Sequence, residues 1–294
     1  MSLNHALHQF ELCFFRKTLE SRAFAQNLAA VSIFTIISPA KRLGSIARTD
    51  RMPSTTIPEF EADARKLAGL MEKKSVPQLM ELMSISKDLA ELNRDRYRDF
   101  PASLSKSDAK EAILQFQGDV FQGLNLARYG SKEFKYLNDH LGILSGMYGL
   151  LRPFDRMHPY RLEMGSRIRI GEAQGLYQFW GKRITDALKK RIQQSGAKVL
   201  MNLASDEYSR SVDLKCIDEP IASADFLELR NGKWKVVSTN AKRARGIMLD
   251  WMIRKRPASI SALKKFDVGY EFAEEVADSK GIHRLVFHKK DIQA

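Results

Sequence analysis

Apolar residues gather in short β-branched runs at several places in the chain, and these runs predict strands. Residues 31–37 form one such run, which ends at Ser38-Pro39, a pair typical of a turn. Residues 197–204 form a second run of similar length. Residues 141–153 are apolar and contain three glycines, which favours a strand followed by a tight turn.

Two segments show the pattern of a hairpin. In residues 224–239, two arms of alternating apolar and polar residues flank Asn231-Gly232, the dipeptide favoured by a type I′ turn. The apolar residues within 268–272 and 285–287 predict a second hairpin near the end of the chain.

Other segments place apolar residues three and four positions apart, which predicts amphipathic helices. Asp108 and Glu111 indicate a capping box for a helix that runs to Phe116, and Ser205 indicates the N-cap of a short helix. Two short helices, from Pro77 and Ser86, are separated by a break at 84–86. Four longer helices are predicted over residues 58–73, 131–140, 177–194 and 240–256.

Helices and strands alternate without a repeat or a low-complexity linker. We therefore expect an α/β (mixed α+β) fold with a single compact domain over residues 33–294. Residues 1–32 stand apart and contain three basic and two acidic residues. They are interpreted as an N-terminal extension, with three alternatives: an organellar targeting segment, an upstream start, or an ordinary extra helix.

Charge narrows the choice of partners. The 294 residues carry a formal net charge of +13, and the sequence pI is about 9.7. Residues 1–32 account for +1 of this charge, so the basic surplus belongs to the body of the protein. A surplus of this size favours polyanionic partners, and the alternative is a solvated basic surface.

Several kinds of chemistry have no signature in the sequence. Cys13 and Cys216 are the only cysteines, and the six histidines show no H-x-x-x-H spacing, so neither a disulfide framework nor a zinc site nor another cofactor is predicted. The two cysteines suit a reducing compartment, and we expect a cytoplasmic protein without a membrane span. No phosphate loop, dinucleotide fingerprint or nucleophile elbow occurs, and no pair of a nucleophile and a base can be identified. The sequence motifs therefore do not support an enzymatic activity.

The densest charge cluster is LLRPFDRMHPYRLEMG, residues 150–165. Arg152 and Arg161 are expected to pair with Asp155 and Glu163, which would make the loop rigid. Residues 151–170 hold five arginines against these two acids, so some guanidinium groups should remain for an anion. Aromatic candidates for stacking on a base or lining a cleft are Tyr148, Tyr160 and Trp180, with a buried role as the alternative.

A second cluster, residues 239–256, lies in a predicted helix, and the Lys41-Arg42 turn forms a third. Lys242, Arg243 and Arg245 fall in the first turns of that helix, where free N–H groups and cations together favour an anion. The alternative is that these cations are solvated. On the helical wheel, Lys242, Arg245 and Gly246 lie opposite the apolar face of this helix. The apolar face comprises Ala244, Ile247, Met248, Trp251 and Met252.

Five ordered motifs together resemble the YaaA peroxide-stress protein family. They are IISPAK (36–41), LSGMYGLLRPFDRMHPYRLEMG (144–165), LYQFWG (176–181), NLASDEY (202–208) and AKRARG (241–246). The resemblance covers the chain from about Ile33 onward. It implies a single-domain α/β fold with a positively charged cleft, binding of duplex and unpaired DNA, and protection from hydrogen peroxide by limiting free iron.

The resemblance also implies a helix–hairpin–helix element, for which residues 76–93 are the best match. Ser86 and Lys87, at the start of the second helix, would then join the phosphate contacts. The glycine-rich hairpin of such elements is absent, and a plain αα-corner is the alternative.

Three functions follow from these patterns. The leading hypothesis is a DNA-binding peroxide-stress protein whose phosphate contacts are Lys41, Arg152, Arg161, Lys242, Arg243 and Arg245. The second is a metal-assisted enzyme acting on a nucleotide or phosphodiester, with Glu163 as acid, base or metal ligand. The third is a protein-interaction role in iron handling. No oligomeric state is predicted.

Overall fold

The computed structural model describes residues 32–277 and 281–290. The predicted extension, residues 1–32, therefore lies outside the described residues except for Ser32. The described residues belong to one compact unit, as expected for a single α/β domain.

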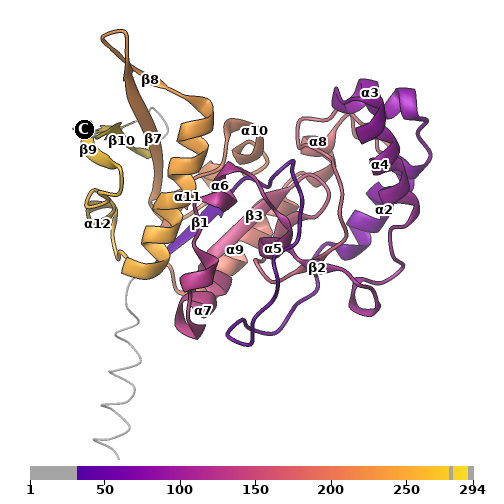
Figure 1. Ribbon diagram of the computed structural model, residues 1–294, viewed down its shortest axis with the longest axis horizontal. Helices are drawn as coiled ribbons and strands as arrows, with labels where there is room; N and C mark the ends of the chain where they lie inside the picture. Colours follow the sequence, from indigo (N-terminus) through magenta and orange to yellow (C-terminus); the bar gives the residue numbers. More distant parts are fainter. Residues whose placement is uncertain (1–31, 278–280, 291–294) are drawn as a thin grey trace, which may run out of the picture. The chain divides into compact units, whose positions relative to one another are not determined.

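An eight-stranded sheet forms the centre of this unit (Figure 1). Five strands run parallel: β3 (Leu141–Ser145), β1 (Ile33–Ile37), β6 (Val199–Asn202), β7 (Ile221–Arg230) and β10 (His283–Lys289). Three are antiparallel to their neighbours: β4 (Gly149–Leu151), β9 (Tyr270–Ala277) and β8 (Lys233–Val236). The order is β4-β3-β1-β6-β7-β10-β9, with β8 attached to β7.

The strand predictions are confirmed, and the reason is burial. Every residue of β1 is buried, which explains the unbroken apolar run at that point of the sequence. The hairpin of β7 and β8 turns at Asn231 and Gly232, which have φ angles of 52° and 70°, as a type I′ turn requires. The second predicted hairpin is β9 paired with β10.

The longer helices also form at the predicted places. They are α2 (Glu61–Glu72), α3 (Val76–Met83), α4 (Lys87–Arg98), α7 (Ser131–His140), α9 (Arg183–Ser195) and α11 (Ser238–Lys255). The shorter ones are α5 (Ala112–Gln115), α6 (Asp119–Gln122), α8 (Leu176–Trp180), α10 (Asp206–Ser209) and α12 (Ile260–Leu263). In Figure 1, α11 crosses in front of the sheet, where it packs on β7 and α6.

Two helix predictions were wrong in detail. The helix expected over residues 177–194 is interrupted at Gly181, whose φ of +50° ends α8 before α9 begins. The capping box at Asp108 and Glu111 does not form, because Glu111 belongs to β2 (Lys110–Glu111), which pairs with β5 (Arg156–Met157). The Glu111 carboxylate instead forms an ion pair with Arg48.

The predicted break between α3 and α4 is confirmed. Ser84 adopts the left-handed conformation, with a φ of 50°, and ends α3. The Ser86 hydroxyl then accepts a hydrogen bond from the Leu89 N–H and caps α4. Two short helices therefore meet at a capped corner.

A close contact between α6 and α11 corrects the helical-wheel assignment of Gly246. This glycine is buried, and a Cβ atom placed on it would lie 1.9 Å from the Val120 carbonyl oxygen of α6. A Cβ on Gly123, just after α6, would lie 2.5 Å from the backbone of Gly246. The two glycines thus let the backbones touch directly, and α6 is fixed against α11.

We expect Gly246→Ala to lower the free energy of unfolding by about 1–3 kcal/mol, because the added methyl group overpacks a contact between backbones. Urea unfolding followed by circular dichroism measures this change. Gly69→Ala in α2 is the control, since nothing lies within 4 Å of a Cβ at that position, and it should be neutral or stabilise by up to about 1 kcal/mol. Equal effects of the two substitutions would contradict the close-contact explanation.

Candidate functional site

The strands β1 and β6 lie side by side, but the chain leaves them in opposite directions. The strand after β1 in the sheet path is β3 on one side, whereas β6 leads to β7 on the other. Such a switch point leaves a crevice beyond the carboxyl ends of the two strands, where α/β proteins bind ligands. A pocket of about 390 Å³ lies at this place, lined by residues that follow both strands.

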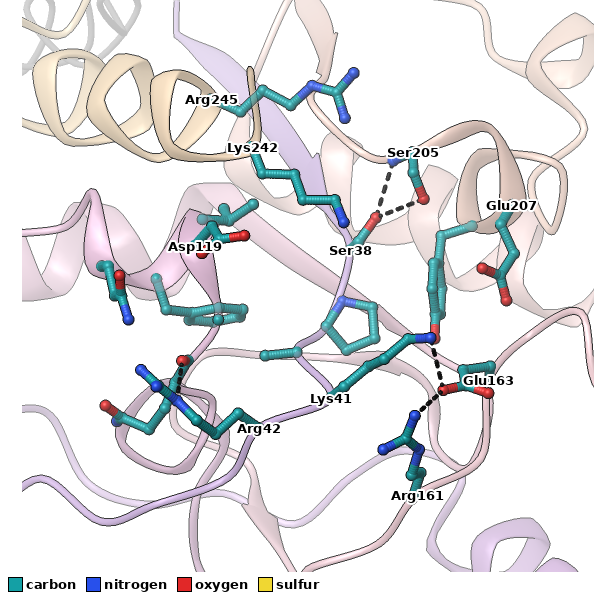
Figure 2. Close-up of a pocket in the computed structure, with 18 of the residues that line it drawn as sticks. Ser38, Lys41, Arg42, Asp119, Arg161, Glu163, Ser205, Glu207, Lys242 and Arg245 are labelled. Atoms are coloured by element: carbon teal, nitrogen blue, oxygen red, sulfur yellow. Dashed lines mark hydrogen bonds and ion pairs between the residues drawn. The ribbon is translucent and has the colours of Figure 1, made fainter. Parts of the chain in front are cut away.

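Two serine side chains join the loops at this switch point. Ser38 follows β1, and its hydroxyl accepts a hydrogen bond of 2.9 Å from the Ser205 N–H. The two hydroxyl oxygens are 3.1 Å apart (Figure 2). Ser205 is the residue before α10, as predicted, but its side chain makes no capping hydrogen bond because it is turned toward Ser38. The pair fixes the spacing of the two loops that form the pocket.

Glu163 holds two cations on one wall of the pocket. Its Oε1 atom lies 3.1 Å from Lys41 Nζ and 3.2 Å from Arg161 Nη2 (Figure 2). The Glu163 and Arg161 side chains are 15% and 17% exposed, whereas that of Lys41 is 67% exposed. The sequence-based expectation that Glu163 would pair with Arg161 therefore agrees with the geometry, and Lys41 joins them from the loop after β1.

The opposite wall carries two further cations from α11. Lys242 and Arg245 both line the pocket, and Figure 2 shows both side chains extending from the same helix, with Lys242 directed toward Ser38. Arg245 is partly buried and forms no hydrogen bond or ion pair with any residue that the structure describes. Burial lowers the pKa of its guanidinium group, and Asp225 and Asp206 oppose this effect. A charge withdrawn from water without a bonded partner is costly unless an anion compensates it.

Arg243 differs from its two neighbours. It is exposed and is not among the residues that line the pocket. The position of the helix start also differs from the expectation, because α11 begins at Ser238, two residues earlier than predicted. The three cations therefore follow the first turn. The Ala241 N–H is already bonded to the Val237 carbonyl oxygen at 2.8 Å, and residues 238–240 do not line the pocket. The helix start therefore contributes no N–H group to this pocket, and Lys242 and Arg245 reach it with their side chains.

The pocket also contains polar residues that were not among the predicted contacts, although Arg42 belongs to the basic turn that includes Lys41. Arg42 donates a hydrogen bond of 3.0 Å to the Gln117 carbonyl oxygen, and Glu207 Oε1 accepts one of 2.9 Å from the Gly165 N–H. Asp119 lines the pocket without a side-chain hydrogen bond or ion pair to any described residue. The only signal in the sequence is position, since Glu207 follows β6 closely, whereas nothing local to Asp119 indicates that α6 reaches the pocket.

Two tyrosine residues, Tyr160 and Tyr208, also line the pocket. Burial raises the pKa values of Tyr160 and Tyr208, so both hydroxyls remain protonated at neutral pH. The Tyr160 hydroxyl lies 2.7 Å from the Ser145 hydroxyl in the core. The Tyr160 ring is therefore packed in the protein interior beside the pocket and offers no free face for stacking on a base.

Other predicted site residues lie elsewhere. Tyr148 and Trp180 are 0% and 1% exposed, so their rings belong to the core and offer no face to a base. The Trp180 ring N–H donates to the Gly146 carbonyl oxygen at 3.1 Å. Ser86 caps α4 and Lys87 forms an ion pair with Glu91, and neither lines the pocket.

Arg152 is also absent from the pocket lining. Its backbone N–H donates a hydrogen bond of 2.7 Å to Asp155 Oδ2, but no ion pair joins the two side chains, so the predicted pairing is wrong. Asp155 is buried and accepts a second hydrogen bond from the Thr56 hydroxyl. Arg156 donates to the carbonyl oxygens of Ala109, Ser105 and Ser107. This part of the arginine-rich stretch therefore stabilises loops.

Neither a metal-binding cluster nor a membrane-spanning helix occurs in the described part of the chain. Within residues 32–277 and 281–290, no group of three or more His, Cys, Asp or Glu side chains is arranged to hold a metal ion. No helix in the same ranges has the length and apolar character that crossing a membrane requires.

The fold and pocket define a mixed α/β protein with a pocket lined by charged residues at the switch point of its sheet. A family model described as peroxide stress protein YaaA matches residues 33–276, and the chain belongs to this family. The resemblance drawn from the five sequence motifs is therefore confirmed, and family membership suggests a role in peroxide stress.

Relatives of similar length support this membership. The chain is 42% identical over 258 residues to a UPF0246 protein of Delftia acidovorans, covering 87% of the chain and 98% of that protein. It is 40% identical over 257 residues to one from Saccharophagus degradans, covering 87% and 98%. It is 39% identical over 258 residues to one from Legionella pneumophila, covering 87% and 100%.

We expect Glu163→Gln to lower the free energy of unfolding by about 1–3 kcal/mol, because the largely buried Arg161 loses its carboxylate partner. Urea unfolding measures the change. Glu91→Gln is the control, since it removes an exposed ion pair with Lys87 and should have almost no effect. Equally small effects would show that Glu163 does not compensate a buried charge.

Proposed function

We propose that this protein binds phosphate groups of DNA during peroxide stress, through the cations that surround the switch-point pocket. The observation that carries this proposal is Arg245, a partly buried cation that lines the pocket and has no hydrogen bond or ion pair to a described residue. A phosphate oxygen would supply the missing negative charge through short, charge-assisted hydrogen bonds.

The neighbouring side chains favour the same ligand. Lys242 lies three residues before Arg245, so both side chains extend from one face of α11. The pocket lining contains five basic side chains and three acidic ones, namely Lys41, Arg42, Arg161, Lys242 and Arg245 against Asp119, Glu163 and Glu207. A surplus of positive charge remains after internal pairing, as an anion-binding surface requires.

Phosphate binding offers a physical route to protection from peroxide. Divalent iron held near DNA as a counterion would generate damaging radicals beside the strand. A protein that neutralises phosphates with Lys and Arg releases their counterions. Occupation of the backbone by this protein would therefore keep iron away from the DNA, in agreement with family membership. Both duplex and unpaired DNA present the required phosphates.

The proposal predicts that the double substitution Lys242→Ala and Arg245→Ala weakens DNA binding roughly tenfold to a hundredfold. It should also reduce the slope of log affinity against log salt by about one for each phosphate that the variant no longer neutralises. Fluorescence anisotropy with labelled duplex and bubble DNA, across a salt series, measures both quantities.

Arg243→Ala provides the matched control, because it removes one positive charge from the same helix outside the pocket. It should change affinity much less than Arg245→Ala alone. Equal weakening in these two single variants would show that only total charge matters. Absence of binding by the unaltered protein at about 50 mM salt, where phosphate contacts are strong, would refute DNA binding altogether.

A further inference from the structure

We infer that the switch-point pocket holds a single nucleoside monophosphate through its phosphate monoester, either as a free nucleotide or as the terminal nucleotide of a DNA strand. This inference deepens the proposed phosphate-binding function and rests on the same cations. The nucleotide inference differs from the proposed DNA-binding function, because contacts along a DNA backbone involve phosphodiesters and need no enclosed pocket.

The size and place of the pocket favour a small ligand. Its volume of about 390 Å³ lies within the range of small-molecule sites, roughly 300–1,000 Å³. The loops after β1 and β6 bound it, and the Ser38–Ser205 hydrogen bond holds these loops at a fixed spacing. A cavity formed this way encloses one nucleotide more readily than a length of duplex, which needs an open surface.

The charges in the pocket match a phosphate monoester. The five basic and three acidic lining side chains leave a surplus of two positive charges. A monoester carries about −1.5 to −2 near pH 7, whereas each diester in a strand carries about one negative charge. The monoester therefore compensates the surplus, and an internal phosphodiester leaves part of it uncompensated.

The distribution of these charges indicates where the phosphate would lie. Lys41 and Arg161 are already paired with Glu163, while Lys242 and Arg245 form no ion pair with a described residue. Figure 2 shows Lys242 pointing from α11 toward Ser38. We therefore place the phosphate between the α11 cations and the Ser38 loop, away from the Glu163 wall.

The remaining lining suits a nucleoside. Pro39, Val120, Phe121 and Leu203 supply apolar surface beside the charged groups, a combination typical of small-ligand sites. The Asp119 carboxylate has no hydrogen bond or ion pair to a described residue, so it can accept hydrogen bonds from sugar hydroxyls or base amino groups. An acidic side chain in this role beside a switch-point phosphate site is a common way to bind a sugar.

Isothermal titration calorimetry of the full chain tests this inference. The ligands are the 5′- and 3′-monophosphates of the four ribonucleosides and the four deoxyribonucleosides, the parent nucleosides, and inorganic phosphate. At least one monophosphate should bind at a single saturable site and at least tenfold more tightly than its nucleoside or inorganic phosphate. No saturable monophosphate binding, or equal binding of monophosphate and nucleoside, would overturn the inference.

Two variants locate the ligand. Arg245→Ala should weaken binding of the monophosphate at least tenfold. Asp119→Asn should also weaken binding of the monophosphate, but it should leave the weak binding of inorganic phosphate unchanged. Arg243→Ala is again the control and should stay within about twofold of the unaltered protein. Thermal unfolding of each variant establishes that it is folded. If the folded Arg245 and Asp119 variants both bind like the unaltered protein, the nucleotide is not in this pocket.

A second arm separates the two sources of the monoester. Single-stranded DNA with terminal phosphates is compared with the same strand bearing hydroxyl ends, with the tightest monophosphate as competitor. Preference for phosphorylated ends together with competition assigns the pocket to strand ends, whereas monophosphate binding without competition assigns it to free nucleotide. If the protein binds DNA but binds none of the monophosphates, only this inference is overturned. Monophosphate binding without any DNA binding would overturn only the proposed DNA function.

Discussion

The parallel pairing of β1 with β6 is the contact on which the rest of this structure depends. Both strands are apolar, and the register Ile33 to Val199 through Ile36 to Asn202 brings their carboxyl ends to the same edge. Because the chain then departs in opposite directions, the loops after the two strands diverge and leave a crevice at that edge. The hydrogen bond between Ser38 and Ser205 holds the opening at a fixed width. Side chains from distant segments then surround a space that the fold itself leaves open.

Basic residues serve two separate purposes in this protein, and their partners distinguish them. Arg191 is buried and donates to the carbonyl oxygens of Leu141 and Leu151, and Arg156 donates to three loop carbonyl oxygens. Such arginines compensate backbone groups that would otherwise be unsatisfied. Lys242 and Arg245 have no such partners among the described residues. The high net charge alone does not separate these groups, whereas the contacts do.

Periodicity in the sequence was sufficient for most of the fold but not for the composition of the site. The apolar run at β1 and the Asn231-Gly232 turn carry their structure locally, so both were predictable. The break in the helix before α9 was not, because Gly181 adopts a positive φ of 50° within an otherwise continuous helical pattern. Local patterns identify elements well, and they miss interruptions that tertiary packing decides.

The site residues divide in the same way. Glu163 and Arg161 are two residues apart, so their pairing could be inferred from the sequence. Asp119 enters the pocket only because α6 packs against α11, a contact between segments more than a hundred residues apart. Tyr148 and Trp180 show the converse error: aromatic residues beside arginines look like a stacking surface, but the core contains them. Long-range packing decides which charged and aromatic residues face the ligand.

The contact between Gly123 and Gly246 also determines how this site can change over time. The obstacle to a side chain at Gly246 is the backbone of α6, so no smaller neighbouring side chain relieves a substitution there. Neither glycine can therefore acquire a side chain while the two helices keep their spacing. The outer surface of α11 is free of this restriction, and Arg243 lies there. Variation in charge along the exposed side of the helix can alter attraction to an anion without displacing the residues that hold it.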